Sequence, residues 1–164
     1  MNIKKIISIC CLILVSACSA GGPGNVHVVV KPVWGSAFCG NASPAGLQLI
    51  ASSVELKAWL HGRTEPVPEI TVGLKDNYLL VVNMGQQSSG GYGLSLLKEQ
   101  AEITGRHLLI SVRWQTPKPG MMQAQVITSP CLLVSVPRQD NYNAIVIFDQ
   151  NIKKRFTFKI KASQ

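Results

Sequence analysis

The stretch that decides the fold is residues 78–97, Tyr-Leu-Leu-Val-Val-Asn-Met-Gly-Gln-Gln-Ser-Ser-Gly-Gly-Tyr-Gly-Leu-Ser-Leu-Leu. Two short apolar runs, at 78–82 and 92–97, are separated by a polar segment that contains glycines. Apolar runs of this length between turn signals are typical of strands. The paired glycines can take positive φ angles, which allows a sharp exposed loop. The stretch therefore predicts two strands joined by the loop 86–91.

The same signals recur through most of the chain. A possible tight hairpin turn falls at Thr104-Gly105, and residues 35–46 and 117–120 carry the Gly, Ser, Asn and Pro typical of loops. The fold class expected is mainly β, an antiparallel β-sandwich or open barrel with one short helix. Further strands are predicted at 26–30, 108–113, 121–127, 132–136, 144–148 and 156–161, with the basic run 153–155 as a solvated turn.

One helix is marked, at about 53–61. Ser52 and Glu55 have the spacing of a capping box, in which each side chain bonds the other residue's backbone N–H. Gly62 ends the helix, and the Pro-Val-Pro of 66–68 cannot continue it. The apolar face expected for the helix comprises Val54, Leu56, Ala58, Trp59 and Leu60.

The first residues have the order of a secretory signal: Lys4 and Lys5, an apolar run at 6–15, then small residues. The apolar run is too short to span a bilayer. It ends in Val-Ser-Ala-Cys at 15–18, which resembles the lipobox of bacterial lipoproteins. The resemblance implies that Cys18 is acylated and anchors the chain in a membrane. Ser19 in place of Asp favours the outer membrane, and an ordinary signal with an incidental cysteine is the alternative.

The expected layout is a lipoprotein signal peptide at 1–17, a flexible tether at 18–24 and a single β-rich domain at 25–164. The formal net charge of +8 falls by two when Lys4 and Lys5 leave with the signal. Outside the cytoplasm no nucleic acid is expected as a partner. Anionic lipid head groups, cell-wall polymers or an acidic protein face would suit a basic surface, which can also serve solubility alone.

Two cysteines, Cys39 and Cys131, remain once the signal is removed and Cys18 is acylated. In an oxidising compartment two thiols are a candidate disulfide. Two buried free thiols are the alternative, because a small apolar side chain suits the strand that follows Cys131.

No catalytic constellation is evident in the sequence. His27, His61 and His107 lie in unrelated contexts, and no Cys/His spacing suggests a metal site. The few acidic residues form no close pair in an apolar setting. The chain is therefore expected not to be an enzyme, and to need no cofactor, metal or small-molecule substrate.

The segment at 86–92 is the candidate contact surface for a protein partner. Exposed Tyr, Trp and Arg dominate protein interfaces, and a glycine-rich loop brings backbone donors close to a partner chain. The alternative is a hairpin turn with a buried tyrosine. The residues proposed to bind are Ser88, Ser89, Gly90, Gly91 and Tyr92, with Arg113 and Trp114 nearby.

The chain resembles the PrcB C-terminal domain family over roughly residues 47–137. The resemblance implies a non-catalytic lipoprotein that binds and stabilises a subtilisin-like protease in a surface complex. The elements that carry it are the strand, loop and Gly-Gly-Tyr of 78–92, then Val-Arg-Trp at 112–114, Pro-Lys-Pro-Gly at 117–120, Gln-Val-Ile-Thr-Ser-Pro at 125–130, the strand 132–137, and the earlier Glu55, Trp59 and Pro68.

Two other functions remain open. Residues 88–92 with Arg113 and Trp114 are similar to two loops of chagasin-like cysteine-protease inhibitors, but the middle proline of the second loop is missing. A structural envelope protein that touches the cell wall or lipopolysaccharide through a basic face is the third class.

Overall fold

The computed structural model describes residues 26–40, 44–61, 63 and 65–160. The expected signal peptide, Cys18 and the tether fall outside these residues. The described elements, in chain order, are β1 (Val26–Val29), β2 (Lys31–Ser36), β3 (Gly46–Ile50), α1 (Ser53–His61), β4 (Asn77–Asn83), β5 (Gly93–Leu96), β6 (Gln100–Thr104), β7 (His107–Gln115), β8 (Cys131–Pro137), β9 (Ala144–Phe148) and β10 (Lys154–Lys159).

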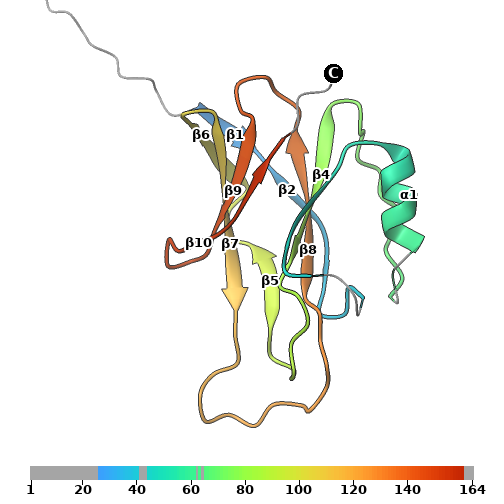
Figure 1. The fold of residues 1–164 in the computed structure, drawn as a ribbon, viewed down its shortest axis with the longest axis vertical. Coiled ribbons are helices and arrows are strands. Elements are labelled where there is room, and N and C mark those ends of the chain that lie inside the picture. The colour runs from blue at the N-terminus through green and yellow to red at the C-terminus, as the bar shows by residue number, and fades with distance from the viewer. Residues whose placement is uncertain (1–25, 41–43, 62, 64, 161–164) are drawn as a thin grey trace, which may run out of the picture.

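These strands form two facing sheets, with α1 on the outer side of the second one (Figure 1). The first sheet has the order β1-β6-β7-β9-β10, with β5 also paired to β7, and the second has the order β2-β8-β4-β3. The expected mainly β fold is confirmed, and it is an open sandwich. One pairing, β7 with β9, is parallel rather than antiparallel. It is parallel because the chain crosses to the other sheet as β8 before it returns.

The apolar runs of β4 and β8 are continuous because both faces of these strands are buried. Leu80 and Val82 of β4 lie in the core between the sheets. Leu79 and Val81, which point the other way, lie in a second cluster beneath α1 and the irregular segment 66–74. The second sheet is thus a central layer, covered on both sides.

The helix has the predicted bounds and the predicted cap. The Glu55 backbone N–H donates to Ser52 Oγ at 3.2 Å, and the Ser52 N–H donates to Glu55 Oε2 at 3.1 Å. The apolar face is narrower than expected, since Trp59 is the buried residue of the helix and Val54 is 74% exposed. A helix of nine residues that packs on the outside of a sheet buries only the narrow strip of side chains that faces the sheet.

The hairpin between β6 and β7 is confirmed, but its turn lies one residue later than predicted. Thr104 pairs with His107, so Gly105 and Arg106 are the two turn residues. Their φ angles are 54° and 66°, and a type I′ turn needs positive φ at both positions. The prediction missed this because arginine is an unusual residue there.

The loop predicted at 35–46 is shorter than expected, because β2 continues to Ser36 and β3 begins at Gly46. Neither strand was predicted. Pro32 lies within β2, which is tolerated because β2 is an edge strand of its sheet.

The strand predicted at residues 121–127 is wrong. These residues are an exposed loop without ladder pairing, between β7 and β8. Figure 1 shows this connection as the long loop that projects beyond the end of the sandwich. The alternation of apolar residues with Gln123 and Gln125 favours an extended chain. Among the described residues, however, no strand lies beside it to complete a sheet.

The basic run at 153–155 is also more than a solvated turn, because β10 begins at Lys154. Arg155 pairs with buried Asp149 at 2.6 Å and is only partly exposed. The alternation predicted for the last strand is confirmed, with Phe156 and Phe158 half-buried and Thr157 exposed.

Candidate functional site

The loop between β4 and β5 carries the predicted binding residues, and it is not a hairpin. β4 belongs to the second sheet and β5 to the first, so residues 84–92 cross from one sheet to the other at one end of the sandwich. A crossing loop cannot be stabilised by pairing of its own flanking strands. It therefore needs contacts with another segment to be held in place.

That other segment is the connection between β7 and β8. Gln87 and Thr128 exchange backbone hydrogen bonds of 2.7 and 3.0 Å, and the Gly90 N–H donates to the Ala124 carbonyl at 2.9 Å. The Thr128 hydroxyl also donates to the Ser89 carbonyl at 3.0 Å. Residues 86–91 and 116–128 thus form one bonded structure, here called the tip.

The paired glycines Gly90 and Gly91 of the crossing loop have different roles. Gly91 has a φ of +87°, and a Cβ there would lie 2.4 Å from the flexible Gln123 Oε1. Gly90 has ordinary φ, and a Cβ there would make only van der Waals contact with Ala124 at 3.5 Å. The backbone conformation therefore requires glycine at 91 but not at 90.

A hollow of about 250 Å³ lies beside Gly91 on the tip. Gln115, which lines it, donates from Nε2 to the Gly91 carbonyl at 3.3 Å. Pro117, Lys118 and Met121 also line the hollow. Pro119 and Gly120 form a turn closed by the Met121 N–H on the Lys118 carbonyl at 3.3 Å, and the φ of +77° at Gly120 fits a type II turn.

Four large apolar side chains are exposed on the second segment of the tip. Met122 is 100% exposed, Met121 60%, Ile127 57% and Val126 41%. These four residues are here called the apolar ridge. A soluble domain seldom exposes several large apolar residues on one loop, and such patches mark interaction sites.

Arg113 and Trp114 do not share one face of the sheet. They are neighbours on β7, so their side chains point to opposite faces. Arg113 is exposed, whereas half-buried Trp114 packs against Phe156, with ring centroids 5.7 Å apart, and lies under Arg155 at 4.7 Å. Because both lie within a strand, the second loop of the chagasin-like comparison is not present as a loop.

Asp149 organises the root of the tip. Its Oδ1 accepts the backbone N–H groups of Asn151 and Lys153, and its Oδ2 accepts Arg155 Nε. Burial alone would raise the pKa of Asp149, but these hydrogen bonds and the Arg155 charge together hold the pKa below its ordinary value. The adjacent Gln150 amide bonds both backbone groups of Trp114, at 2.8 and 3.2 Å, just before the tip begins.

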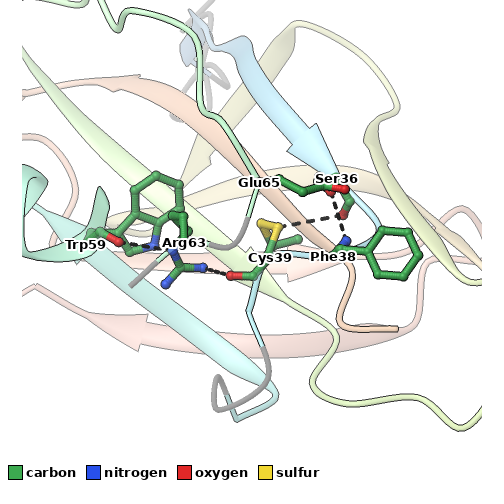
Figure 2. The surroundings of a disulfide bond; sticks show 7 residues. Ser36, Phe38, Cys39, Trp59, Arg63 and Glu65 are labelled. Atoms are coloured by element: carbon green, nitrogen blue, oxygen red, sulfur yellow. Dashed lines mark hydrogen bonds between the residues drawn. A yellow bond between two sulfur atoms is a disulfide. The ribbon is translucent and has the colours of Figure 1, made fainter. Parts of the chain in front are cut away.

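A disulfide between Cys39 and Cys131 lies at the same end of the sandwich. Its Cα atoms are 5.8 Å apart, and the two residues are 92 positions apart in the chain. Figure 2 shows Arg63 reaching from Trp59 to the Cys39 carbonyl, which accepts a hydrogen bond from the guanidinium. Arg63 also lies over the Trp59 ring at 4.4 Å. The disulfide therefore joins the loop after β2 to the start of β8. The Arg63 hydrogen bonds to the Trp59 and Cys39 carbonyls connect α1 to the same loop.

Tyr92 is half-buried, so its ring is neither a core residue nor fully available to a partner. Ser88 in the same loop is exposed. The apolar ridge was missed because residues 121–127 were interpreted as a strand. The signal that could have indicated a loop is the placement of this segment between Pro119-Gly120 and Pro130, which leaves no room for a turn into a neighbouring strand.

His27, His61 and His107 are exposed, and they lie on β1, on α1 and on β7 respectively. Within the described ranges, no three His, Cys, Asp or Glu side chains are grouped so that they could hold a metal ion. No helix in the described part of the chain is long and apolar enough to cross a membrane.

The fold and the tip define a class of protein: an open two-sheet β-sandwich with a loop platform at one end. Residues 78–137 match the family described as PrcB C-terminal. The resemblance to that family is thus confirmed over this segment, a little over a third of the chain, and not over the wider 47–137 expected. No curated protein and no solved structure matches the chain.

Proposed function

We propose that this chain is a lipid-anchored, non-catalytic subunit that binds a protein partner, a protease, through its tip. The observation that carries the proposal is the bonding of two separate loops into one exposed structure. Ser88, Ser89, Gly90 and Gly91 contribute backbone and small polar groups, while the second segment contributes the apolar ridge.

The family match supports the proposal that the tip binds the partner. Residues 78–137 run from β4 to the end of β8 and include both loops of the tip. The first three strands, α1 and the hairpin of β9 with β10 all lie outside the match. The segment that the family has in common therefore builds the tip together with the strands that hold it.

The position of the first described residue supports a tip held away from the membrane. Val26 pairs with Ile103, which pairs with Leu108 near the start of β7. The tip follows the other end of β7, whose nine residues at roughly 3.3 Å each span about 30 Å. If Cys18 is acylated at the outer membrane, the tether 18–24 joins the domain at the end remote from the tip.

Capture by a photo-reactive amino acid tests the proposed partner. We expect the probe at exposed Ser88, in intact cells, to crosslink to a protease that mass spectrometry identifies. The matched control is the same probe at Val54, which is exposed on α1. Crosslinks to lipopolysaccharide or cell-wall polymer alone would support the envelope function instead, and equal capture at Val54 would contradict a role of the tip.

Intact mass tests the anchor. The membrane form is expected to exceed the mass of residues 18–164 by the added acyl groups, because three chains hold a protein stably in a bilayer. Cys18→Ala should abolish membrane attachment. An unmodified soluble form as the main species would contradict the proposal.

A further inference from the structure

Resting on the proposed function, we infer the chemistry of the partner: the tip docks against an apolar protein face that is edged with carboxylates. Lys118 lies opposite one of these carboxylates, at the rim of the hollow. The juxtaposition that carries the inference is an apolar ridge at the same end of the sandwich as several exposed cations.

The apolar ridge is suited to a protein surface of irregular shape. Met121 and Met122 are flexible, polarizable side chains that adapt to the surface they meet. The exposed Gln125 lies between the ridge residues and brings amide groups to the same surface. Protein interfaces combine an apolar centre with hydrogen-bonding groups in this way.

The charges at this end of the molecule are unbalanced. Arg113 and Lys118 are exposed, and Lys153 and Lys154 flank the root of the tip on the turn that carries Gln150. Two carboxylates of the described chain that lie near this end are engaged within the fold. Glu65 accepts a hydrogen bond from the Ser36 hydroxyl, and Asp149 is buried with Arg155 and two backbone N–H groups.

Carboxylates on a partner would complement these cations, steer the encounter and fix the orientation. The hollow beside Gly91 offers a place for one such side chain. Pro117 and Met121 can pack against its methylene groups, while Lys118 meets its charge.

Two other occupants fit less well. A second copy related by twofold symmetry would bring the same cations against one another. Insertion into a bilayer would place the backbone of residues 121–127 in hydrocarbon, where its unpaired peptide groups are costly. Few of those groups have backbone partners, namely the Met121 and Val126 N–H groups and the Ala124 carbonyl.

The test uses the full lipoprotein in detergent and the partner captured at Ser88. Met122→Ser and Lys118→Glu are each expected to weaken binding about tenfold, since truncating an interface anchor or reversing a rim charge has effects of this size. Lys75→Glu is the charge control, because Lys75 is exposed next to the start of β4, at the end remote from the tip. Thermal unfolding of each variant verifies that the fold is intact.

A probe at Met122 then locates the matching surface on the partner. We expect a crosslinked peptide that contains Asp or Glu, and we expect its acid-to-Lys variant to restore binding to Lys118→Glu. Raising the salt from about 0.05 to about 0.5 M should weaken the wild type more than Lys118→Glu, because salt screens exposed charges.

Each outcome has a separate meaning. If Met122→Ser weakens binding but Lys118→Glu does not, the carboxylate-edged partner is contradicted while the proposed function stands. If neither variant matters although Ser88 still crosslinks, the partner uses residues 86–91 alone and the inference fails. Phospholipid crosslinked at Met122 would indicate a membrane instead. No protein captured at Ser88 would remove the proposed function and the inference together.

Discussion

Two apolar segments of this chain, residues 79–82 and 121–127, lie in opposite environments. All four residues from 79 to 82 are completely buried, whereas Met122 is fully exposed. Both segments were predicted to be strands. β4 has β3 and β8 on its two edges and apolar layers on both faces. The other segment is bonded to the loop 86–91 through the Gly90 N–H on the Ala124 carbonyl.

The comparison shows that an apolar segment favours burial, but that its sequence does not specify which element or partner buries it. An extended segment becomes a strand only where neighbouring strands complete its hydrogen bonds. A segment without such neighbours keeps its apolar side chains available to another molecule.

The largest loss of stability is expected on removal of the disulfide, which lies where the exposed segment meets β8. Replacing both Cys39 and Cys131 with Ala should lower the free energy of unfolding by about 4–5 kcal/mol, because the bond closes a loop of 92 residues in the unfolded chain. Urea unfolding measures this loss. A reductant should shift the wild type and leave the double variant unchanged; an unshifted wild type would show that the bond does not stabilise the fold.

Shortening one apolar side chain to alanine in each segment tests the comparison directly. Leu80→Ala should destabilise the fold by about 2–5 kcal/mol, since it leaves a cavity in the core between the sheets. Ile127→Ala should change the free energy of unfolding by less than about 0.5 kcal/mol, as for an exposed side chain. Equal losses in denaturant unfolding would mean that residues 121–127 pack in the fold.

The root of the tip should be sensitive to acid. In the fold the pKa of Asp149 lies below its ordinary value of 3.8, so its contribution to stability is present above that value. The contribution is lost as the pH falls through the lower pKa of the folded state. Asp149→Asn should reduce stability at neutral pH by about 2 kcal/mol through the lost charged hydrogen bond to Arg155.

Thermal unfolding between neutral pH and about pH 2 measures this difference. The variant should lose less stability than the wild type as the pH falls below 3.8 and through the lower pKa at which the folded wild-type carboxyl becomes protonated. Parallel curves for the two proteins would contradict the assigned cause.

The smallest expected change in stability distinguishes Gly91 from Gly90 in the crossing loop. Gly91→Ala should cost about 1–2 kcal/mol because a Cβ is unfavourable at a φ of +87°. Gly90→Ala should be nearly neutral, since its Cβ has room beside Ala124. Hydrogen exchange at residues 86–91 should rise in the first variant alone. Similar exchange in both would mean that the tip does not depend on this turn.

Strands with buried or alternating apolar residues were predictable, as β4, β7 and β9 show, and so was the cap of α1. β2 and β3 were not, because a proline and glycines weaken their local patterns and pairing with β8 and β4 stabilises them. For the candidate site, residues 88–91 were placed on an exposed loop, but the ridge beside them and the inward direction of Trp114 depend on contacts between distant segments.

By itself, the sequence determined which segments are apolar, where the helix begins and which residues can turn the chain. These features depend on neighbours a few positions away. Only the tertiary structure decided that β4 and β5 belong to different sheets and that the crossing loop is bonded to residues 124–128. The physical reason is that strand pairing and burial join residues far apart in the chain, and local pattern does not specify which partners meet. The apolar ridge is exposed because no strand in the described part of the chain lies beside it.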